Sequence, residues 1–218
     1  MGLKSSTCGI LSQGLETVQQ QIRKALEILR RGGLVAYPTD TVYGLGADAT
    51  NSDAVKRIFA VKARPLTMAL PILVADKEMM KAATKNLPPA AMQLADSFWP
   101  GALTLVVERS ALIPDIVTAN ASTVAVRIPG HTTPRALAKE LGAPLVGTSA
   151  NKSGQPSTTT AREVKAQLGK EAGYVVTGLC KGGIESTILD LTQRPPKILR
   201  TGPVTQEQLE AVIGKVAA

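Results

Sequence analysis

Four short segments contain most of the side chains that could do chemistry. Their hydroxyls, a few cations and backbone amides left open by glycine are the groups that together bind anions. None of them matches the phosphate loop GxxxxGK[ST] or the dinucleotide fingerprint GxGxxG. One such segment alone could be an ordinary turn, because the same residue types dominate turns; four in one chain, mostly after predicted strands, favour a binding site. The segments are 38–46, 62–65, 148–157 and 178–187.

Lys62 and Arg64 are two residues apart, just after a predicted helix. In extended backbone, residues i and i+2 point the same way, and Pro65 biases Arg64 toward that geometry. We therefore predict that both cations face one ligand. The alternative is a charged turn in solvent.

Histidine and cysteine chemistry is nearly excluded. The chain has one histidine, His131, and two distant cysteines, Cys8 and Cys180, so a His/Cys zinc site is not expected. Two cysteines without a CxxC indicate a reducing compartment rather than a disulfide scaffold. No GxSxG elbow accompanies His131, and we expect a surface loop histidine rather than a member of a catalytic triad.

The formal charge of +8 could indicate RNA binding, yet the basic residues are dispersed in short clusters. One Trp, three Tyr and two Phe are too few for the stacking platform of single-strand nucleic-acid binders. The apolar fraction of 44% argues against disorder, and no apolar run approaches the ~20 residues of a membrane helix. We expect a cytoplasmic protein that does not enter the membrane.

Helical and strand patterns alternate along the chain, which predicts a layered α/β or α+β domain. Capping boxes are expected at Thr160–Glu163 and Thr205–Gln208. Pro71 should restrict the strand predicted over 68–74 to a sheet edge or a bulge. We expect a flexible tail over 1–14 and a single domain over 15–218. The other strands are predicted at 34–37, 103–107, 124–127, 145–146, 174–176, 186–191 and 197–200.

These segments also resemble a known family. The chain is similar to the YrdC-like family, whose enzymatic members are threonylcarbamoyl-AMP synthases, and the combination of Lys-x-Arg with Ser-x-Asn is the most specific part of the match. The resemblance covers nearly the whole chain in the expected order. The matching segments are PTDTVYGLG (38–46), KARP (62–65), FWPGALT (98–104), VAVRIP (124–129), TSANKSGQPS (148–157), ESTILD (185–190) and ILRTGP (198–203).

The resemblance implies a twisted mixed β-sheet with flanking helices around a basic concave cavity. It implies a nucleotidyltransferase that joins L-threonine, bicarbonate and ATP into threonylcarbamoyl-AMP and pyrophosphate, for a downstream transferase complex that modifies tRNA. Mg²⁺ is expected to accompany ATP, held by phosphates and water, with no metal site made by the protein. The alternative is a non-catalytic relative that binds double-stranded RNA or tRNA in the basic cavity.

The resemblance also implies roles for individual residues. The two motifs supply the catalytic set of Lys62, Arg64, Ser149 and Asn151. The positions that match ATP contacts are Arg64, Thr123, Ser149, Ser157 and Arg200. The positions that match threonine contacts are Thr41, Arg127, Gly147 and Ser186. A phosphoryl-type transfer of this kind needs positioning and charge neutralisation more than a protein nucleophile, so a site without His or Cys is chemically sufficient.

Two positions depart from the longer, two-domain relatives. Met68 replaces an asparagine near the ATP contacts, and Leu73 replaces a histidine near the threonine contacts. The departures leave open a third reading, in which a synthase-like enzyme acts on another amine or acid.

Overall fold

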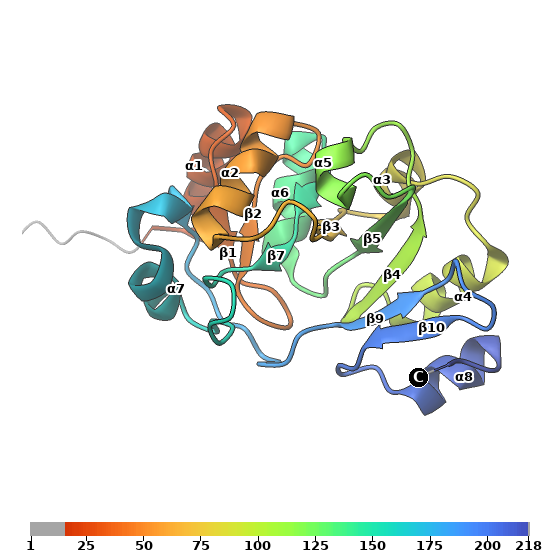
Figure 1. The fold of residues 1–218 in the computed structure, drawn as a ribbon. Helices are drawn as coiled ribbons and strands as arrows, with labels where there is room; N and C mark the ends of the chain where they lie inside the picture. The colour runs from red at the N-terminus through yellow and green to blue at the C-terminus, as the bar shows by residue number, and fades with distance from the viewer. Residues whose placement is uncertain (1–15, 218) are drawn as a thin grey trace, which may run out of the picture.

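Two mixed β-sheets, with helices packed around them, make up the fold of the computed structural model, which describes residues 16–217 (Figure 1). The predicted tail over 1–14 lies outside the described residues. The smaller sheet has the order β7 (Thr148–Ser149), β2 (Gly44–Gly46), β1 (Val35–Tyr37) and β8 (Tyr174–Val175). The larger sheet has the order β10 (Lys197–Arg200), β9 (Thr187–Asp190), β4 (Leu103–Glu108), β5 (Thr123–Arg127), β3 (Ile72–Leu73) and β6 (Leu145–Val146). The predicted mixed α/β class is confirmed.

The helices begin where the sequence offers side-chain caps. The two predicted capping boxes open α7 and α8, and Thr17 with Gln20 forms a third at α1. Asn51 caps α2 by accepting from the amides of Asp53 and Ala54, both at 3.1 Å. The helices are α1 (Val18–Arg30), α2 (Ser52–Lys62), α3 (Lys77–Ala83), α4 (Pro89–Phe98), α5 (Asp115–Thr118), α6 (Thr132–Leu141), α7 (Ala161–Leu168) and α8 (Gln206–Ile213), with a 3₁₀ turn at Gly169–Ala172.

Because side chains alternate along each strand, the larger sheet has an apolar face and an opposite face, here called the polar face. On the polar face Thr104, Thr123 and Arg127 lie beside apolar residues such as Val106 and Ile188. On β5, Val124 and Val126 are buried in the core, whereas Thr123, Ala125 and Arg127 point to the opposite face. The same alternation on β4 and β9 buries Leu103, Leu105 and Leu189 in the main apolar cluster, together with residues of α3, α4 and α8. The polar face is thereby left free to form the floor of a site.

The chain passes from the larger sheet to the smaller one within a few residues, between β6 and β7. Val146 donates its amide to Ala47 at 2.9 Å, and the Tyr37 hydroxyl donates to the Val146 carbonyl at 2.9 Å. The Tyr37 ring crosses β2 so closely that a Cβ on Gly44 or Gly46 would lie 2.7 or 2.6 Å from it. These two glycines therefore let the sheets meet.

Two details differ from the sequence predictions. The segments 38–46 and 148–157, which were predicted to lie outside the strands, contain β2 and β7, which pair with each other antiparallel. The strand predicted over 68–74 is only β3, and it lies inside the sheet between β5 and β6 rather than at an edge. Pro71 comes just before this strand, so its missing N–H removes no ladder hydrogen bond.

Candidate functional site

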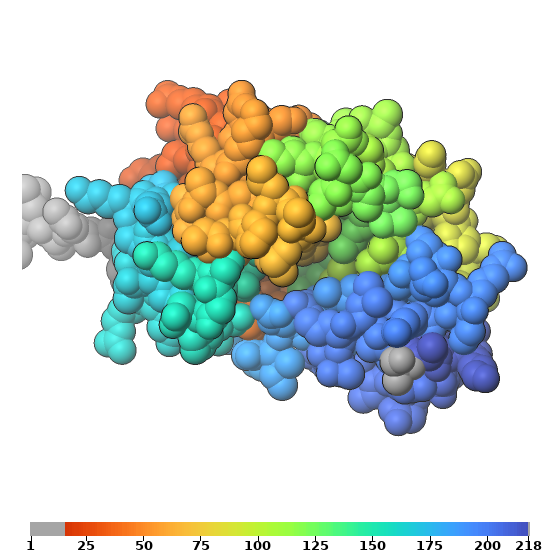
Figure 2. Space-filling view, in the orientation of Figure 1, coloured from red at the N-terminus to blue at the C-terminus, as the bar shows by residue number. Residues whose placement is uncertain are grey.

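A cavity of about 500 Å³ opens over the polar face of the larger sheet, where the smaller sheet meets it. Figure 2 shows the surface hollowed between the segment after α2, in orange, and the β9–β10 region, in blue. The floor comes from alternate residues of three neighbouring strands, and segments from both sheets form the walls. The polar and charged lining residues are Thr41, Arg64, Thr104, Thr123, Arg127, Thr148, Ser149, Glu185, Ser186, Asp190 and Arg200.

Arg127, at the end of β5, is the most buried cation on the cavity floor, with 5% of its surface exposed. Its guanidinium donates to the Gly101 carbonyl at 2.7 Å, to Thr41 Oγ1 at 3.1 Å and to Asp40 Oδ1 at 2.5 Å. Burial lowers the pKa of Arg127, and the Asp40 carboxylate opposes that shift. Three of its five N–H groups are thus held by the protein, which fixes the guanidinium and leaves one N–H on each terminal nitrogen for a further acceptor.

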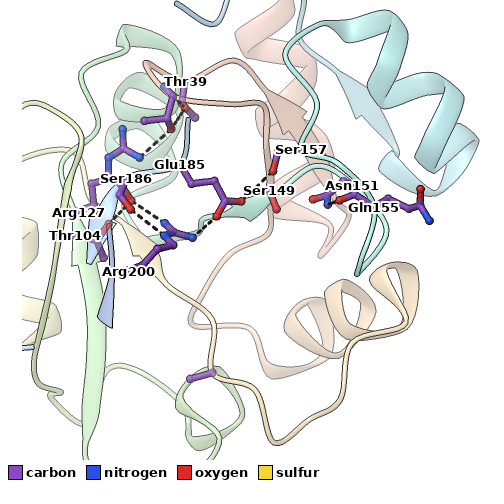
Figure 3. Close-up of polar contacts among 12 residues, drawn as sticks. Thr39, Thr104, Arg127, Ser149, Asn151, Gln155, Ser157, Glu185, Ser186 and Arg200 are labelled. Atoms are coloured by element: carbon purple, nitrogen blue, oxygen red, sulfur yellow. Dashed lines mark hydrogen bonds and ion pairs between the residues drawn. The ribbon is translucent and has the colours of Figure 1, made fainter. Parts of the chain in front are cut away.

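A second polar network, the mouth network, connects four segments across the mouth of the cavity (Figure 3). Arg200 on β10 pairs with the Glu185 carboxylate, whose other oxygen accepts from the Ser157 hydroxyl at 3.0 Å. Arg200 also donates to the carbonyl and the hydroxyl of Ser186, at 2.9 and 3.1 Å. Ser186 in turn shares a hydrogen bond of 2.8 Å with Thr104 on β4. The network aligns hydroxyls and a guanidinium along one side of the cavity.

Lys62 lies beneath the cavity wall and is 2% exposed. Its ammonium donates to the carbonyls of Ser149 and Asn151 at 2.5 and 2.6 Å, and to the Asn151 Oδ1 atom at 3.2 Å. Lys62 therefore ties α2 to the Ser-x-Asn segment and fixes where Ser149 enters the cavity. Burial lowers the pKa of Lys62 to about 8, with repulsion from Arg64 adding to the shift and Glu185 opposing it.

The predicted common direction of Lys62 and Arg64 is wrong. Lys62 is still the last residue of α2, and Ala63 then adopts a left-handed conformation with φ of 49°. The backbone is not extended there, so the i,i+2 argument does not apply. Lys62 points inward, whereas Arg64 donates to the carbonyls of Met68 and Ala69 at 3.2 and 2.9 Å and lines the cavity.

The buried ammonium of Lys62 gives a pH prediction. Lys62 releases its proton near pH 8 when folded and near its ordinary value of 10.5 when unfolded, so between these values the unfolded chain binds more protons. Stability should therefore increase with pH through this window. We expect the free energy of unfolding of the wild type, relative to Lys62→Met, to rise by about 3 kcal/mol between pH 7 and pH 10.5. Urea titrations at several pH values measure this difference.

The exposed Lys56 on the same helix offers a matched control. The difference between wild type and Lys56→Met should stay constant over the same range. A Lys62→Met curve that ran parallel to the wild type at all pH values would contradict the assignment of a buried, easily deprotonated ammonium.

Gly202 packs directly against the backbone of the segment that carries Glu185 and Ser186. A Cβ at this position would lie 2.4 Å from the Thr187 nitrogen and 2.5 Å from the Glu185 carbonyl oxygen, and neither atom belongs to a flexible side chain. We expect Gly202→Ala to cost about 3 kcal/mol of unfolding free energy, measured by urea denaturation. Gly154→Ala is the comparison, since Gly154 faces open space and an alanine there would be strained only by the φ of 80°, at about 1–2 kcal/mol. Equal losses would contradict the close packing at Gly202.

The cavity brings together most of the residues predicted from sequence. Of those predicted for ATP, it is lined by Arg64, Thr123, Ser149 and Arg200; of those predicted for threonine, by Thr41, Arg127, Gly147 and Ser186. Lys62, Asn151 and Ser157 lie outside the lining, and Lys62 and Asn151 bind each other behind the wall.

Leu73 and Met68, the two departures, have different surroundings. Leu73 is 4% exposed and packs on Gly147, where a Cβ would lie 2.4 Å from its side chain. It gives the cavity an apolar wall beside Arg127. Met68 is 48% exposed and does not line the cavity.

Sequence reasoning missed three residues of the site. Asp40 pairs with Arg127, Glu185 pairs with Arg200, and Thr104 supports Ser186. All three lie inside the segments that match the family. Asp40 and Glu185 each precede a predicted contact residue, and Thr104 lies on the strand predicted over 103–107. The alternation of β4 was the available signal for Thr104, whereas the two carboxylates could be placed only by the tertiary fold.

His131 is not a free loop side chain. It is half-buried, and its Nδ1 accepts from the Thr133 amide at 3.1 Å, so it caps α6. Burial lowers its pKa, and Asp40 opposes that shift. Within residues 16–217, no three His, Cys, Asp or Glu side chains gather where they could hold a metal ion, and no helix there has the length and apolar character to cross a membrane.

Comparison with known proteins places these features in context. The family model for Sua5, YciO and YrdC proteins, described as telomere recombination, matches residues 27–202. A threonylcarbamoyl-AMP synthase of Pyrococcus abyssi is 44% identical over 90% of this chain and 58% of its own length. One of Bacillus subtilis is 45% identical over 93% of this chain and 59% of its own length. The crystal structure of P. abyssi Sua5 complexed with L-threonine superposes with a TM-score of 0.89 at 41% identity, covering 93% of this chain and 60% of that one. The chain thus spans about three-fifths of the length of these relatives.

Proposed function

Because the chain belongs to the Sua5/YciO/YrdC family, we propose that it is an L-threonylcarbamoyladenylate synthase that converts L-threonine, bicarbonate and ATP into threonylcarbamoyl-AMP and pyrophosphate. The observation that carries this proposal is the cavity itself. It combines one fixed, buried guanidinium with two further arginines and a row of hydroxyls, in a chain whose relatives are named for this activity. The product would serve a downstream transferase that modifies tRNA, in the cytoplasm.

Arg127 is the proposed receptor for the threonine carboxylate. Its two remaining N–H groups can form a bidentate pair, and Thr41 and Ser186 lie close enough to its network to contact the same amino acid. Leu73 over Gly147 supplies apolar surface at this end of the cavity, suited to a side-chain methyl group. This arrangement supports a small hydroxylated amino acid as the substrate.

The triphosphate is assigned to the part of the cavity lined by Arg64, Ser149 and Arg200. These residues would donate to its oxygens and the two arginines would balance its charge, with Thr123 on the floor. Ser157 lies outside the lining and would donate from beside Glu185. Lys62 and Asn151 act as positioning residues that hold Ser149. We propose that Mg²⁺ arrives with ATP and is held by phosphates and water, since the described side chains offer no cluster of ligands.

The chemistry then requires no protein nucleophile. The threonine amine and bicarbonate combine to a carbamate with loss of water. A carbamate oxygen attacks the α-phosphorus, the bond from that phosphorus to the bridging oxygen breaks, and pyrophosphate leaves. The protein aligns the carbamate with the α-phosphate and neutralises the charge that accumulates on the leaving group.

Pyrophosphate release tests the proposal. With purified protein and ATP, we expect pyrophosphate to appear only when threonine and bicarbonate are both present. Release in the absence of threonine, or none with all three substrates, would contradict it. RNA binding that ATP cannot displace, together with no pyrophosphate release, would favour the non-catalytic alternative.

A further inference from the structure

The carboxylate of Glu185 lies at the mouth of the cavity, among the cations. Both of its oxygens are engaged: one accepts from the Ser157 hydroxyl at 3.0 Å, and the other pairs with the Arg200 guanidinium. Figure 3 shows Glu185 between these two side chains, which come from different segments of the chain. Ser157 and Arg200 are also two of the groups assigned to the triphosphate, so Glu185 occupies hydrogen-bonding positions that phosphate oxygens would need.

The Glu185 carboxylate also stabilises the charged forms of Lys62 and Arg64. Glu185 opposes the lowering of the pKa of both Lys62 and Arg64 that their burial causes. The other carboxylate lining the cavity, Asp190, accepts instead from the amide and the hydroxyl of Thr192, at 2.9 and 2.6 Å. Among the cavity-lining residues, Glu185 is therefore the carboxylate shared by the phosphate-side cations.

The ion pair between Glu185 and Arg200 is weak enough for another anion to replace Glu185. The side chains of Glu185 and Arg200 are 34% and 39% exposed, and ion pairs with that much contact with water are weak. Arg200 is held independently by its two bonds to Ser186, so it would stay in place if Glu185 moved away. A polyphosphate with several negative charges would compete well against one carboxylate for these donors.

We propose that Glu185 is a displaceable counter-anion: it fills the phosphate position of the empty site and yields to the polyphosphate when substrate binds. This inference rests on the proposed function. By competing for Ser157 and Arg200, Glu185 weakens the binding of pyrophosphate and so promotes its release after the reaction. Before ATP binds, the negative charge of Glu185 also offsets the repulsion among the cations of the empty site.

Pyrophosphate binding by calorimetry tests this role with the full chain. Glu185→Gln keeps the shape and an oxygen acceptor for Ser157 but removes the charge. We expect it to bind pyrophosphate about tenfold more tightly than the wild type, the scale of removing one nearby like charge. Glu185→Ala should shift the Kd in the same direction. Glu108→Gln, an exposed site at the end of β4 that does not line the cavity, makes the same change in net charge and should leave the Kd unchanged.

The outcomes separate this proposal from the proposed function. Weaker binding in both Glu185 variants, with unchanged thermal unfolding, would mean that Glu185 braces the site, and the counter-anion role would be wrong. An equal Kd in wild type and Glu185→Gln would also overturn it, while leaving the synthase intact. Absence of pyrophosphate binding in every protein would overturn the counter-anion role, whereas the synthase is decided separately by pyrophosphate release during turnover.

Discussion

Replacing Arg127 by lysine is expected to raise the KM for threonine about 100-fold while changing the KM for ATP little. Lysine keeps the charge, but its single ammonium cannot donate to Gly101, Thr41 and Asp40 and also to a carboxylate. It also lacks the planar fork of a guanidinium that forms bidentate pairs. The substitution should therefore weaken binding of the amino acid substrate rather than of ATP. Steady-state kinetics with each substrate varied in turn measures it.

Arg57→Lys provides the control for this substitution. Arg57 donates to the Gly32 carbonyl at 3.1 Å and does not line the cavity. Its replacement should leave both KM values unchanged. If Arg127→Lys weakened ATP and threonine equally, or neither, Arg127 would not be the receptor for the threonine carboxylate.

Replacing Lys62 by methionine should lower kcat about 10²–10³-fold, the range seen when one preorganised electrostatic group is lost. Methionine matches the length of the buried stem but leaves the carbonyls of Ser149 and Asn151 without their donor. The Ser149 hydroxyl would then no longer be held against the triphosphate. Single-turnover formation of the adenylate product, at saturating ATP and threonine, measures this step directly.

Lys56→Met, on the exposed side of the same helix, should retain the wild-type rate. A Lys62→Met protein that folded and kept its kcat would show that the tie between α2 and the Ser-x-Asn segment is dispensable. Loss of threonine binding alone would likewise contradict the role assigned to Lys62.

One strand of the cavity floor was predicted from sequence, since the strand expected over 124–127 is confirmed as part of β5. Its alternation places Val124 and Val126 in the core and Ala125 and Arg127 on the cavity side. The short strands β2 and β7 could not be predicted, because each is made of residues that are equally common in turns. Only their pairing across the two sheets distinguishes them from loops.

The direction of Lys62 depended on where its helix ends. The sequence KARP is compatible with an extended exit, yet α2 continues to Lys62 and stops at a left-handed alanine, a conformation that residue type alone does not indicate. Likewise, Glu185 and Arg200 meet because β9 and β10 pair antiparallel with an irregular register near Arg200. Such pairings are set by tertiary packing, which local sequence does not encode.

We propose that this cavity joins threonine, bicarbonate and ATP. The most direct test is mass spectrometry of the nucleotide product made with ¹³C-bicarbonate. We expect an AMP adduct of threonine that gains the mass of the heavy carbon and that is absent without threonine. An adduct that carried no label, or AMP and pyrophosphate formed without any threonine adduct, would contradict it.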